Sequence, residues 1–407
     1  MDAIEHSIRQ QQRRDRLFNW LGIACAVICL LVLAALIGGL LYNGWSRLGW
    51  SFLSSFPSPR NAEKAGTLSA LVGSLLVMVI TAASAIPLGV AAGVYLEEYA
   101  KRNWFTSLIE INISNLAAVP SIIYGLMALG LLVYQFHLGQ SILTGGLTLA
   151  FLILPIVIVA TREALRSIPQ MIREAAYALG ASRWEVIKDH LLPYSTGGIA
   201  TGVIIALSRA IGETAPLVTI GAISYIAFLP PAPFSPRPWL TADISKVTVA
   251  AEGPETAMAV GGSLRFVMRD HETLAETGGG LAEVRVGESA ERLRERIDAI
   301  EGLDATFTSS GYLSISCEYG KEFRIVQTGG LAEALKIDLG GGVYGPTEWV
   351  WSSFTVLPIQ MFNWVSRPDA AFAANAAAAG AVLIAVTLSL NAGAIVVRAR
   401  MRRRIKW

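Results

Sequence analysis

Long apolar runs constrain the fold of this chain more than any other feature of its sequence. Leu17–Tyr42 contains no charged side chain, and roughly 20 consecutive apolar residues are enough to cross the hydrocarbon core of a bilayer as a helix. Comparable runs recur along the chain, so we predict an all-α polytopic membrane protein with six transmembrane helices. The predicted spans are Leu17–Tyr42, Leu68–Leu96, Ile111–Phe136, Ser141–Ala160, Ile199–Phe228 and Phe372–Val397.

The composition agrees with this prediction. Of the 407 residues, 53% are hydrophobic and 16% are charged, whereas a typical soluble domain has about 25% charged residues. The mean hydropathy is +0.50. These values exclude an ordinary soluble enzyme or a nucleic-acid-binding protein as the class of the whole chain, and membrane lipids are its expected surroundings.

One segment departs from the apolar pattern. Between residues 240 and 348 the sequence becomes polar and charged, and short β-like runs alternate with glycine clusters at 278–280, 329–330 and 340–342, which we predict to form turns. An amphipathic helix is predicted over Ser289–Ile300, because its apolar residues recur at helical spacing. We therefore predict a small α+β domain (240–348) inserted between two transmembrane parts (1–239 and 349–407). The predicted strands are Lys246–Ala250, Leu264–Met268, Glu283–Val286, Ala305–Ser309, Tyr312–Cys317 and Phe323–Gln327.

The distribution of basic residues predicts the orientation of the spans. With six spans, both termini lie on one side of the membrane, together with the 162–193 loop. That side carries most of the basic residues next to span ends, such as Arg13–Arg16, Lys101–Arg102 and Arg398–Lys406. By the positive-inside rule this side is cytoplasmic, which places the inserted domain on the external face.

The 162–193 loop contains a polar helix–turn–helix, REAAYALGASRWEVIKDHLLP, from Arg173 to Pro193. Gly180 follows a helical run at the position that a helix C-cap favours. Ser182 and Glu185 have the spacing of a capping box, which starts a second helix. A short, rigid, charged element of this kind suits a lever that another protein grips. The alternative is an ordinary solvated loop.

The same loop carries a resemblance to a known family. Glu174-Ala175-Ala176, then Gly180, then Leu192-Pro193 resemble the cytoplasmic loop of binding-protein-dependent ABC importer permeases. The resemblance implies that this loop, here named the coupling loop (162–193), docks on a separate ATP-hydrolysing subunit. The residues expected to contact that subunit are Arg173, Glu174, Ala175, Ala176, Gly180 and Trp184.

Three further segments are similar to phosphate-importer permeases of the PstA type. They are NLAAVPSIIYGL (115–126), SRAIGETAPL (208–217) and SSFTVLPIQMFNWVSRP (352–368). The resemblance covers about residues 1–240 and 348–407 and leaves out the inserted domain. It implies a multi-pass subunit of the bacterial inner membrane that takes part in phosphate import. Its expected partners are a homologous permease of the PstC type, a dimer of ATP-binding subunits of the PstB type and a phosphate-binding protein of the PstS type.

Two charged residues lie within the predicted fifth span. Arg209 and Glu213 are the only charges between Ile199 and Phe228, and each costs roughly 2.5–3.5 kcal/mol at the centre of a bilayer. Four residues apart, they share one face of a helix. A guanidinium offers two parallel donors to a tetrahedral oxyanion, while a neighbouring carboxylate weakens that hold enough for release.

We therefore predict a substrate path through this span. Ser208 and Thr214 are expected to add hydrogen bonds, and Pro120 and Ser121 of the third span are further candidates. The alternatives are a structural ion pair between Arg209 and Glu213, and a simple packing kink at Pro120.

The sequence contains no G-x-x-x-x-G-K-[ST] motif, which would cradle nucleotide phosphates. It also has no H-E-x-x-H or C-x-x-C motif and no nucleophile–base pattern. We expect no catalysis, no metal and no cofactor on this chain, with ATP and Mg bound by the partner ATPase. Two alternatives stay open: a permease for another oxyanion, such as sulfate or molybdate, and a membrane-anchored sensor or adhesin.

Overall fold

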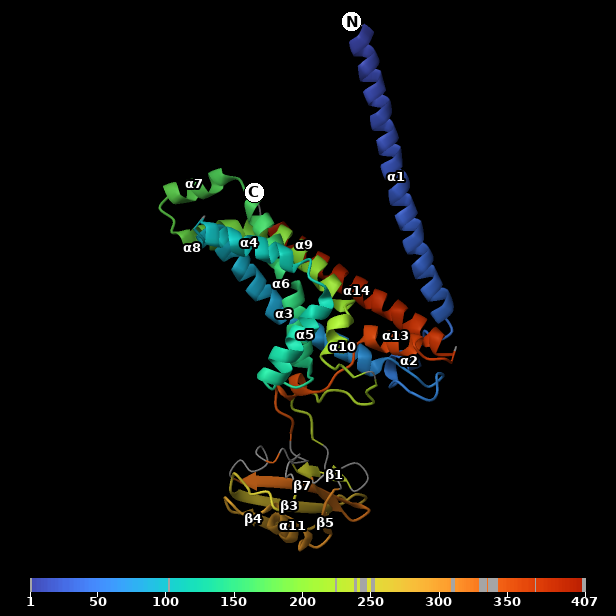
Figure 1. Ribbon diagram of the computed structural model, residues 1–407, viewed down its shortest axis with the longest axis vertical. Coiled ribbons are helices and arrows are strands. Elements are labelled where there is room, and N and C mark those ends of the chain that lie inside the picture. Colours follow the sequence, from blue (N-terminus) through green and yellow to red (C-terminus); the bar gives the residue numbers. More distant parts are fainter. Residues whose placement is uncertain are drawn as a thin grey trace. The chain divides into compact units, whose positions relative to one another are not determined.

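The computed structural model describes residues 2–101, 103–223, 225–237, 240–241, 247–249, 253–308, 312–328, 335, 343–369 and 371–404. The chain divides into two compact units, Met1–Pro230 with Trp349–Trp407, and Pro231–Glu348. The first unit is helical, and the second consists mainly of β-strands (Figure 1). The predicted glycine turns at 329–330 and 340–342 lie outside the described residues.

Long apolar helices dominate the first unit. Among the described residues, five helices are long and apolar enough to cross a membrane, and a bent pair raises the number to six if it counts as one span. The helices are α1 (Asp2–Gly44), α2 (Trp50–Ser54), α3 (Leu68–Val94), η1 (Tyr95–Tyr99), α4 (Trp104–Leu116), α5 (Ser121–Ala128), η2 (Leu129–Gln135), α6 (Ile142–Arg166), α7 (Gln170–Ala178), α8 (Arg183–Glu185), η3 (Val186–Leu191), α9 (Leu192–Ile211), α10 (Ala215–Thr219), η4 (Glu348–Trp351), α13 (Leu357–Val365) and α14 (Ala371–Arg404).

Small residues bring α3 and α6 together, and Figure 1 shows the two helices side by side. A Cβ atom added to Gly89 would lie 2.6 Å from a methyl carbon of Val157, and one added to Gly93 would lie 2.7 Å from Cβ of Thr161. Without a hydrophobic driving force between helices in lipid, this close backbone approach supplies the packing energy. α3 and α6 form the central pair of the unit.

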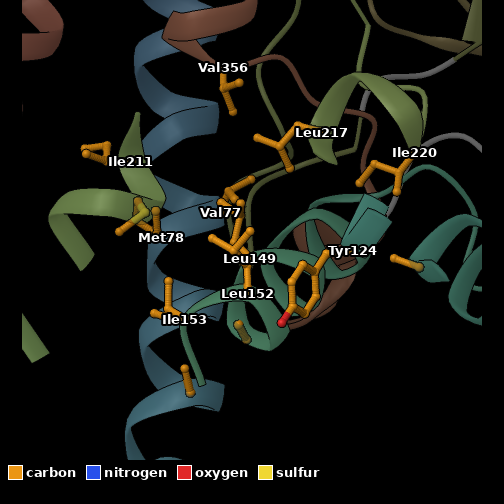
Figure 2. Close-up of a cluster of buried hydrophobic side chains, with 14 of the residues drawn as sticks. Val77, Met78, Tyr124, Leu149, Leu152, Ile153, Ile211, Leu217, Ile220 and Val356 are labelled. Carbon is orange, nitrogen blue, oxygen red and sulfur yellow. The ribbon is translucent and has the colours of Figure 1, made fainter. Parts of the chain in front are cut away.

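The core of the first unit joins this pair to shorter helices. Figure 2 shows Val77 of α3 and Leu149 and Leu152 of α6 close to Tyr124 of α5 and Leu217 of α10. These side chains are all buried. The two short helices α5 and α10 are therefore part of the packed core.

The third predicted span, Ile111–Phe136, is wrong as a continuous helix. α4 ends at Leu116, α5 begins at Ser121, and the chain bends by 105° between them. Pro120 has no N–H to donate, and its ring disfavours helical geometry in the residue before it. The helix therefore stops here, which gives a broken span or a re-entrant loop.

The fifth predicted span, Ile199–Phe228, is also wrong in its limits. The apolar helical segment runs from Arg183 to Ile211, Gly212 caps its C-terminal end, and the five-residue α10 follows. Hydropathy stays high beyond Ile211, but Gly212 favours a helix end and Pro216 lies where a new helix starts. This break changes the setting of both charged residues.

The other four predicted spans overlap α1, α3, α6 and α14. α3 continues through Pro87 as one helix. The helical ends extend beyond the apolar runs into charged residues, most clearly at Arg166.

Within its described residues, the second unit contains two antiparallel sheets and the helix α11. The first sheet has the strand order β1–β7–β3–β4, and the second has the order β2–β6–β5. The elements are β1 (Leu240–Thr241), β2 (Val247–Val249), β3 (Gly262–Asp270), β4 (Glu276–Val284), α11 (Ala290–Asp298), β5 (Leu303–Phe307), β6 (Leu313–Cys317) and β7 (Lys321–Thr328).

This unit has its own apolar core. Leu264, Phe266 and Met268 alternate along β3 and are all buried, as a strand with one covered face requires. Leu293 and Ile297 of α11 belong to the same cluster. Each predicted strand overlaps an observed one over the described residues.

The glycine cluster at 278–280 was predicted as a turn, and this prediction is wrong. The three glycines lie inside β4, opposite Phe266, Val267 and Met268 of β3. A Cβ atom on Gly280 would lie 2.6 Å from Ile300 Cγ1. Glycine therefore serves a close approach within the strand.

The two ends of the second unit pair with each other. Pro236 and Val343 form an isolated antiparallel bridge, and Arg237 forms an ion pair with Glu348. The chain therefore enters and leaves this unit through one paired stem.

Candidate functional site

The turn predicted in the coupling loop is confirmed. α7 ends before Gly180, whose φ of +86° places it in the left-handed region that glycine adopts without strain. Ser182 Oγ accepts from the Glu185 N–H, and the Glu185 carboxylate accepts from the Ser182 N–H at 2.7 Å. The reciprocal bonds complete the capping box that starts α8. Local sequence rules are sufficient to form this element.

The exposed surface of the coupling loop differs from the predicted one in part. Glu174, Ala175, Gly180 and Trp184 are exposed, but Ala176 is buried in the core beneath α7. The structure also exposes three apolar side chains that sequence reasoning missed. They are Met171, Tyr177 and Leu179, and Leu179 is 90% exposed. Their position next to Glu174-Ala175-Ala176 in the sequence is the signal that would have identified them.

Arg173 occupies a different setting, because its side chain folds back onto the same chain. Its guanidinium donates to Glu98 Oε1 at 2.9 Å and to the carbonyl oxygens of Leu165 and Ile168 at 3.0 Å each. The side chain of Arg173 is 18% exposed, and that of Glu98 is 9% exposed. Arg173 thus ties α7 to η1 and to the C-terminal end of α6.

A second set of ion pairs lies beside this contact. Arg162 Nη2 lies 2.6 Å from Glu110 Oε1 of α4, and Arg162 Nε lies 3.5 Å from Glu97 Oε2 of η1. Arg166 Nε donates to the same Glu97 oxygen at 2.9 Å. The two sets border a cavity of about 730 Å³, which is lined by residues of η1, α4, α6 and α7. None of these long-range pairs was predicted from the sequence.

The charged pair of the predicted substrate path lies at the end of α9. Arg209 Nε lies 3.4 Å from Glu213 Oε1, and the two side chains are 40% and 19% exposed. Arg209 is in the last turn of α9 and Glu213 is beyond its C-cap. A cation in the last turn of a helix is stabilised by the helix dipole. The pair therefore spans a helix end, where sequence reasoning placed it on one helical face.

Ser208 contacts a neighbouring span. Its Oγ lies 2.7 Å from the carbonyl oxygen of Ile204 and 2.8 Å from Oδ1 of Asn391 in α14. Sequence reasoning did not identify Asn391, although it is one of two amide side chains, with Asn375, in the mostly apolar helix α14. Its polar side chain in that helix is the signal.

The breaks after α4 and after α9 meet in the core. A Cβ atom on Gly125 of α5 would lie 2.6 Å from Cα of Pro216 in α10. Tyr124 donates its hydroxyl hydrogen to the Leu116 carbonyl at 2.8 Å, which links α5 back to α4. The structure thus brings α5 and α10 together next to the charged pair.

The remaining predicted path residues lie at the starts of these short helices. Pro120 is the N-cap residue of α5, Ser121 is its first residue, and Thr214 is the N-cap residue of α10. Pro120 is exposed, while Ser121 and Thr214 are half-buried. Pro120 therefore marks a true interruption of the helix.

Comparison with known proteins gives a family match. Residues 85–235 match the sequence profile described as "Binding-protein-dependent transport system inner membrane component". The "Probable ABC transporter permease protein YqgI" of Bacillus subtilis is 36% identical over 50% of this chain and 69% of the relative. The phosphate transport system permease protein PstC of Haemophilus influenzae is 30% identical over 62% of this chain and 89% of its own.

A PstA protein is also similar to this chain. The phosphate transport system permease protein PstA of Yersinia pestis is 32% identical over 51% of this chain and 70% of the relative. Among solved structures, the inward-facing MetNI methionine ABC transporter is 20% identical, with a TM-score of 0.32, over 37% of this chain and 73% of that chain.

Proposed function

Because this chain belongs to the family of binding-protein-dependent transport system inner membrane components, we propose that it is a permease subunit of an ATP-driven phosphate importer, of the PstA type. The observation that carries the proposal is the similarity to phosphate transport permeases over most of their length, up to 89% of a relative. Relatives of both the PstA and the PstC type match. The three segments quoted from the sequence favour PstA.

Phosphate is proposed to pass Arg209 on its way through the membrane. The guanidinium is the group that binds an oxyanion through paired hydrogen bonds, and it is 40% exposed. Glu213, at 3.4 Å, competes for the same donors. Binding that is weakened in this way permits release, as conduction requires. Ser208, Thr214, Pro120 and Ser121 line the proposed path around the pair.

The energy for transport comes, in this proposal, from a separate ATPase dimer of the PstB type that binds ATP and Mg. Its contact on this chain is the exposed surface of the coupling loop, with Glu174, Ala175, Gly180 and Trp184 joined by Leu179. Such a surface, with exposed apolar side chains, is typical of a protein-binding site. This chain then acts as a transport subunit with no reaction of its own.

The proposed assembly places this chain in the bacterial inner membrane with six spans, counting the α4–α5 pair as one, and with both termini cytoplasmic. A homologous permease of the PstC type pairs with it, and a phosphate-binding protein of the PstS type docks on the external face. The second unit is then an external insertion. Basic residues flank the proposed cytoplasmic ends of the spans, which supports this orientation.

The test is reconstitution of the purified complex in vesicles with its ATPase and its binding protein. ATP-dependent uptake of labelled phosphate, unaffected by excess sulfate or molybdate, is the expected result. Uptake that sulfate or molybdate suppresses would assign the permease to another oxyanion. A preparation that carries no ATPase subunit and moves no anion would contradict the transport role and favour a membrane-anchored sensor or adhesin.

A further inference from the structure

We propose that Arg173 and Glu98 are positioning residues that transmit movement of the coupling loop to the broken segment α4–α5 and so to the charged pair at Arg209. The inference rests on the proposed function and extends it to a defined route inside this chain. Each step of the route is a contact within the first unit.

The first step joins α7 to η1, which follows α3. Arg173 contacts one carboxylate oxygen and two backbone carbonyls, so its guanidinium is held on three sides, by Glu98, Leu165 and Ile168. A planar fork held in this way resists rotation and displacement. A force on α7 therefore moves Glu98 and the end of α6 together.

The second step joins η1 to α4. Glu97 is the chain neighbour of Glu98, and both Arg162 and Arg166 of α6 contact its Oε2 atom. Arg162 also contacts Glu110 of α4 at 2.6 Å. The Arg162 side chain is 8% exposed, so water screens this pair far less than a surface pair. α4 is thereby tied to the same cluster as α7.

The third step leads from α4 across the break to the charged pair. Tyr124 donates to the Leu116 carbonyl and links α5 to the last turn of α4. Gly125 of α5 packs directly against Pro216 of α10. α10 begins two residues after Glu213, so a displacement of α10 changes the distance between Glu213 and Arg209.

Charged contacts suit this task better than apolar ones. An apolar contact tolerates sliding, whereas a buried ion pair is directional and its loss leaves an unpaired charge. The cavity of about 730 Å³ beside the cluster gives the surrounding helices room to move. The ion pairs and the cavity together are consistent with a cluster that moves as a rigid unit.

The experiment compares reconstituted complexes by the phosphate they move per ATP hydrolysed. Glu98→Gln removes the charge, and Glu98→Asp keeps it on a shorter side chain. Asp15→Asn is the matched control, because Asp15 is exposed in α1 and lies outside both the coupling loop and the ion-pair cluster. The double variant Arg173→Gln with Glu98→Gln, compared with each of the two single variants, tests whether the two residues act as one unit.

The expected result for Glu98→Gln is an assembled complex that still hydrolyses ATP but moves at least about tenfold less phosphate per ATP. Glu98→Asp recovers part of the loss, Asp15→Asn behaves as wild type, and the double variant is no worse than Glu98→Gln alone. If Glu98→Gln prevents assembly, the test is made with Glu98→Asp, by the amount of phosphate that its complex moves per ATP hydrolysed.

An unchanged ratio in Glu98→Gln, or losses that simply add in the double variant, would overturn the inference. A wild-type complex that hydrolyses ATP but moves no phosphate would instead contradict the proposed function.

Discussion

Arg209 Nε lies 3.4 Å from Glu213 Oε1, although α9 ends at Ile211, between the two residues. A pair on one helical face keeps its spacing when the helix moves. A pair across a helix end is different, because the spacing depends on the angle between α9 and α10. The distance between cation and carboxylate is thus adjustable, and this is the property that a site alternating between binding and release needs.

Replacing Arg209 by alanine tests the anion site. We expect Arg209→Ala to reduce ATP-driven phosphate uptake at least about a hundredfold, because the paired donors to the oxyanion are lost. The complex should still assemble, since the side chain is 40% exposed. Uptake in vesicles and copurification of the subunits are the two measurements. Arg209→Lys keeps the charge but not the paired donors of the guanidinium, so its phosphate uptake should lie between that of the wild type and that of Arg209→Ala. Normal uptake in Arg209→Ala would contradict the proposed anion site.

Replacing Glu213 by glutamine tests the role of the carboxylate. With the competing anion gone, phosphate is held more tightly, so KM for uptake should fall about fivefold while the maximal rate also falls. Initial rates over a range of phosphate concentrations measure both values. A purely structural ion pair predicts something else: reduced yield of the complex with an unchanged KM.

Much of the coupling loop was predictable because short-range rules determine it. Gly180, Ser182 and Glu185 lie within six positions, and each acts on its neighbours through backbone geometry. The same is true of the strands around Phe266, whose alternation is visible in the sequence. Local signals of this kind can be read from the sequence without any knowledge of the fold.

The ion-pair cluster was not predictable for the opposite reason. Arg173 and Glu98 are separated by 75 positions, and nothing in either neighbourhood indicates the other. The limits of the fifth span were missed because hydropathy averages over residues and does not register the single glycine at 212. Charged residues next to a break are therefore placed correctly only by the structure.

Adding a side chain at Gly180 tests whether the coupling loop docks on the ATPase through this turn. At φ +86° a β-branched side chain costs about 1–2 kcal/mol, while no atom lies within 4 Å of the added Cβ. Gly180→Val should therefore distort the backbone between α7 and α8 and lower ATPase-coupled uptake. The control is Gly197→Ala, in a helix with equally open space. Unchanged coupled transport in Gly180→Val would count against docking through this turn.

The second unit should lose stability in acid. The Arg296 guanidinium and the Arg285 backbone N–H hydrogen-bond to Glu288 and lower the pKa of that carboxyl from 4.5 to about 2. Hydrogen bonds from Thr273 also lower the pKa of Asp270. A lowered pKa in the folded state means stability that is present above pH 4.5 and lost as the pH falls toward 2.

Hydrogen exchange of the full chain, corrected for the intrinsic rate at each pH, measures this loss. Peptides covering α11 and β4 should lose protection below about pH 4.5, and Glu288→Gln should flatten the dependence. Glu272→Gln, at an exposed position, is the control. Protection that stays constant down to pH 2 would show that these carboxylates do not stabilise the unit.

The contact between α5 and α10 is open to a test with a matched pair of glycines. In Gly125→Ala the new methyl group would lie 2.6 Å from Cα of Pro216 and still closer to Thr219 Oγ1. Backbone atoms cannot yield as a flexible side chain does, so the two short helices must separate, at a cost of about 1–3 kcal/mol. Gly130→Ala lies in η2, only five positions away, and meets no atom within 4 Å. We expect a lower thermal midpoint and reduced phosphate uptake for the first variant and wild-type values for the second. Equal behaviour of the two variants would mean that α5 and α10 move independently, and the charged pair would then have no mechanical connection to α4.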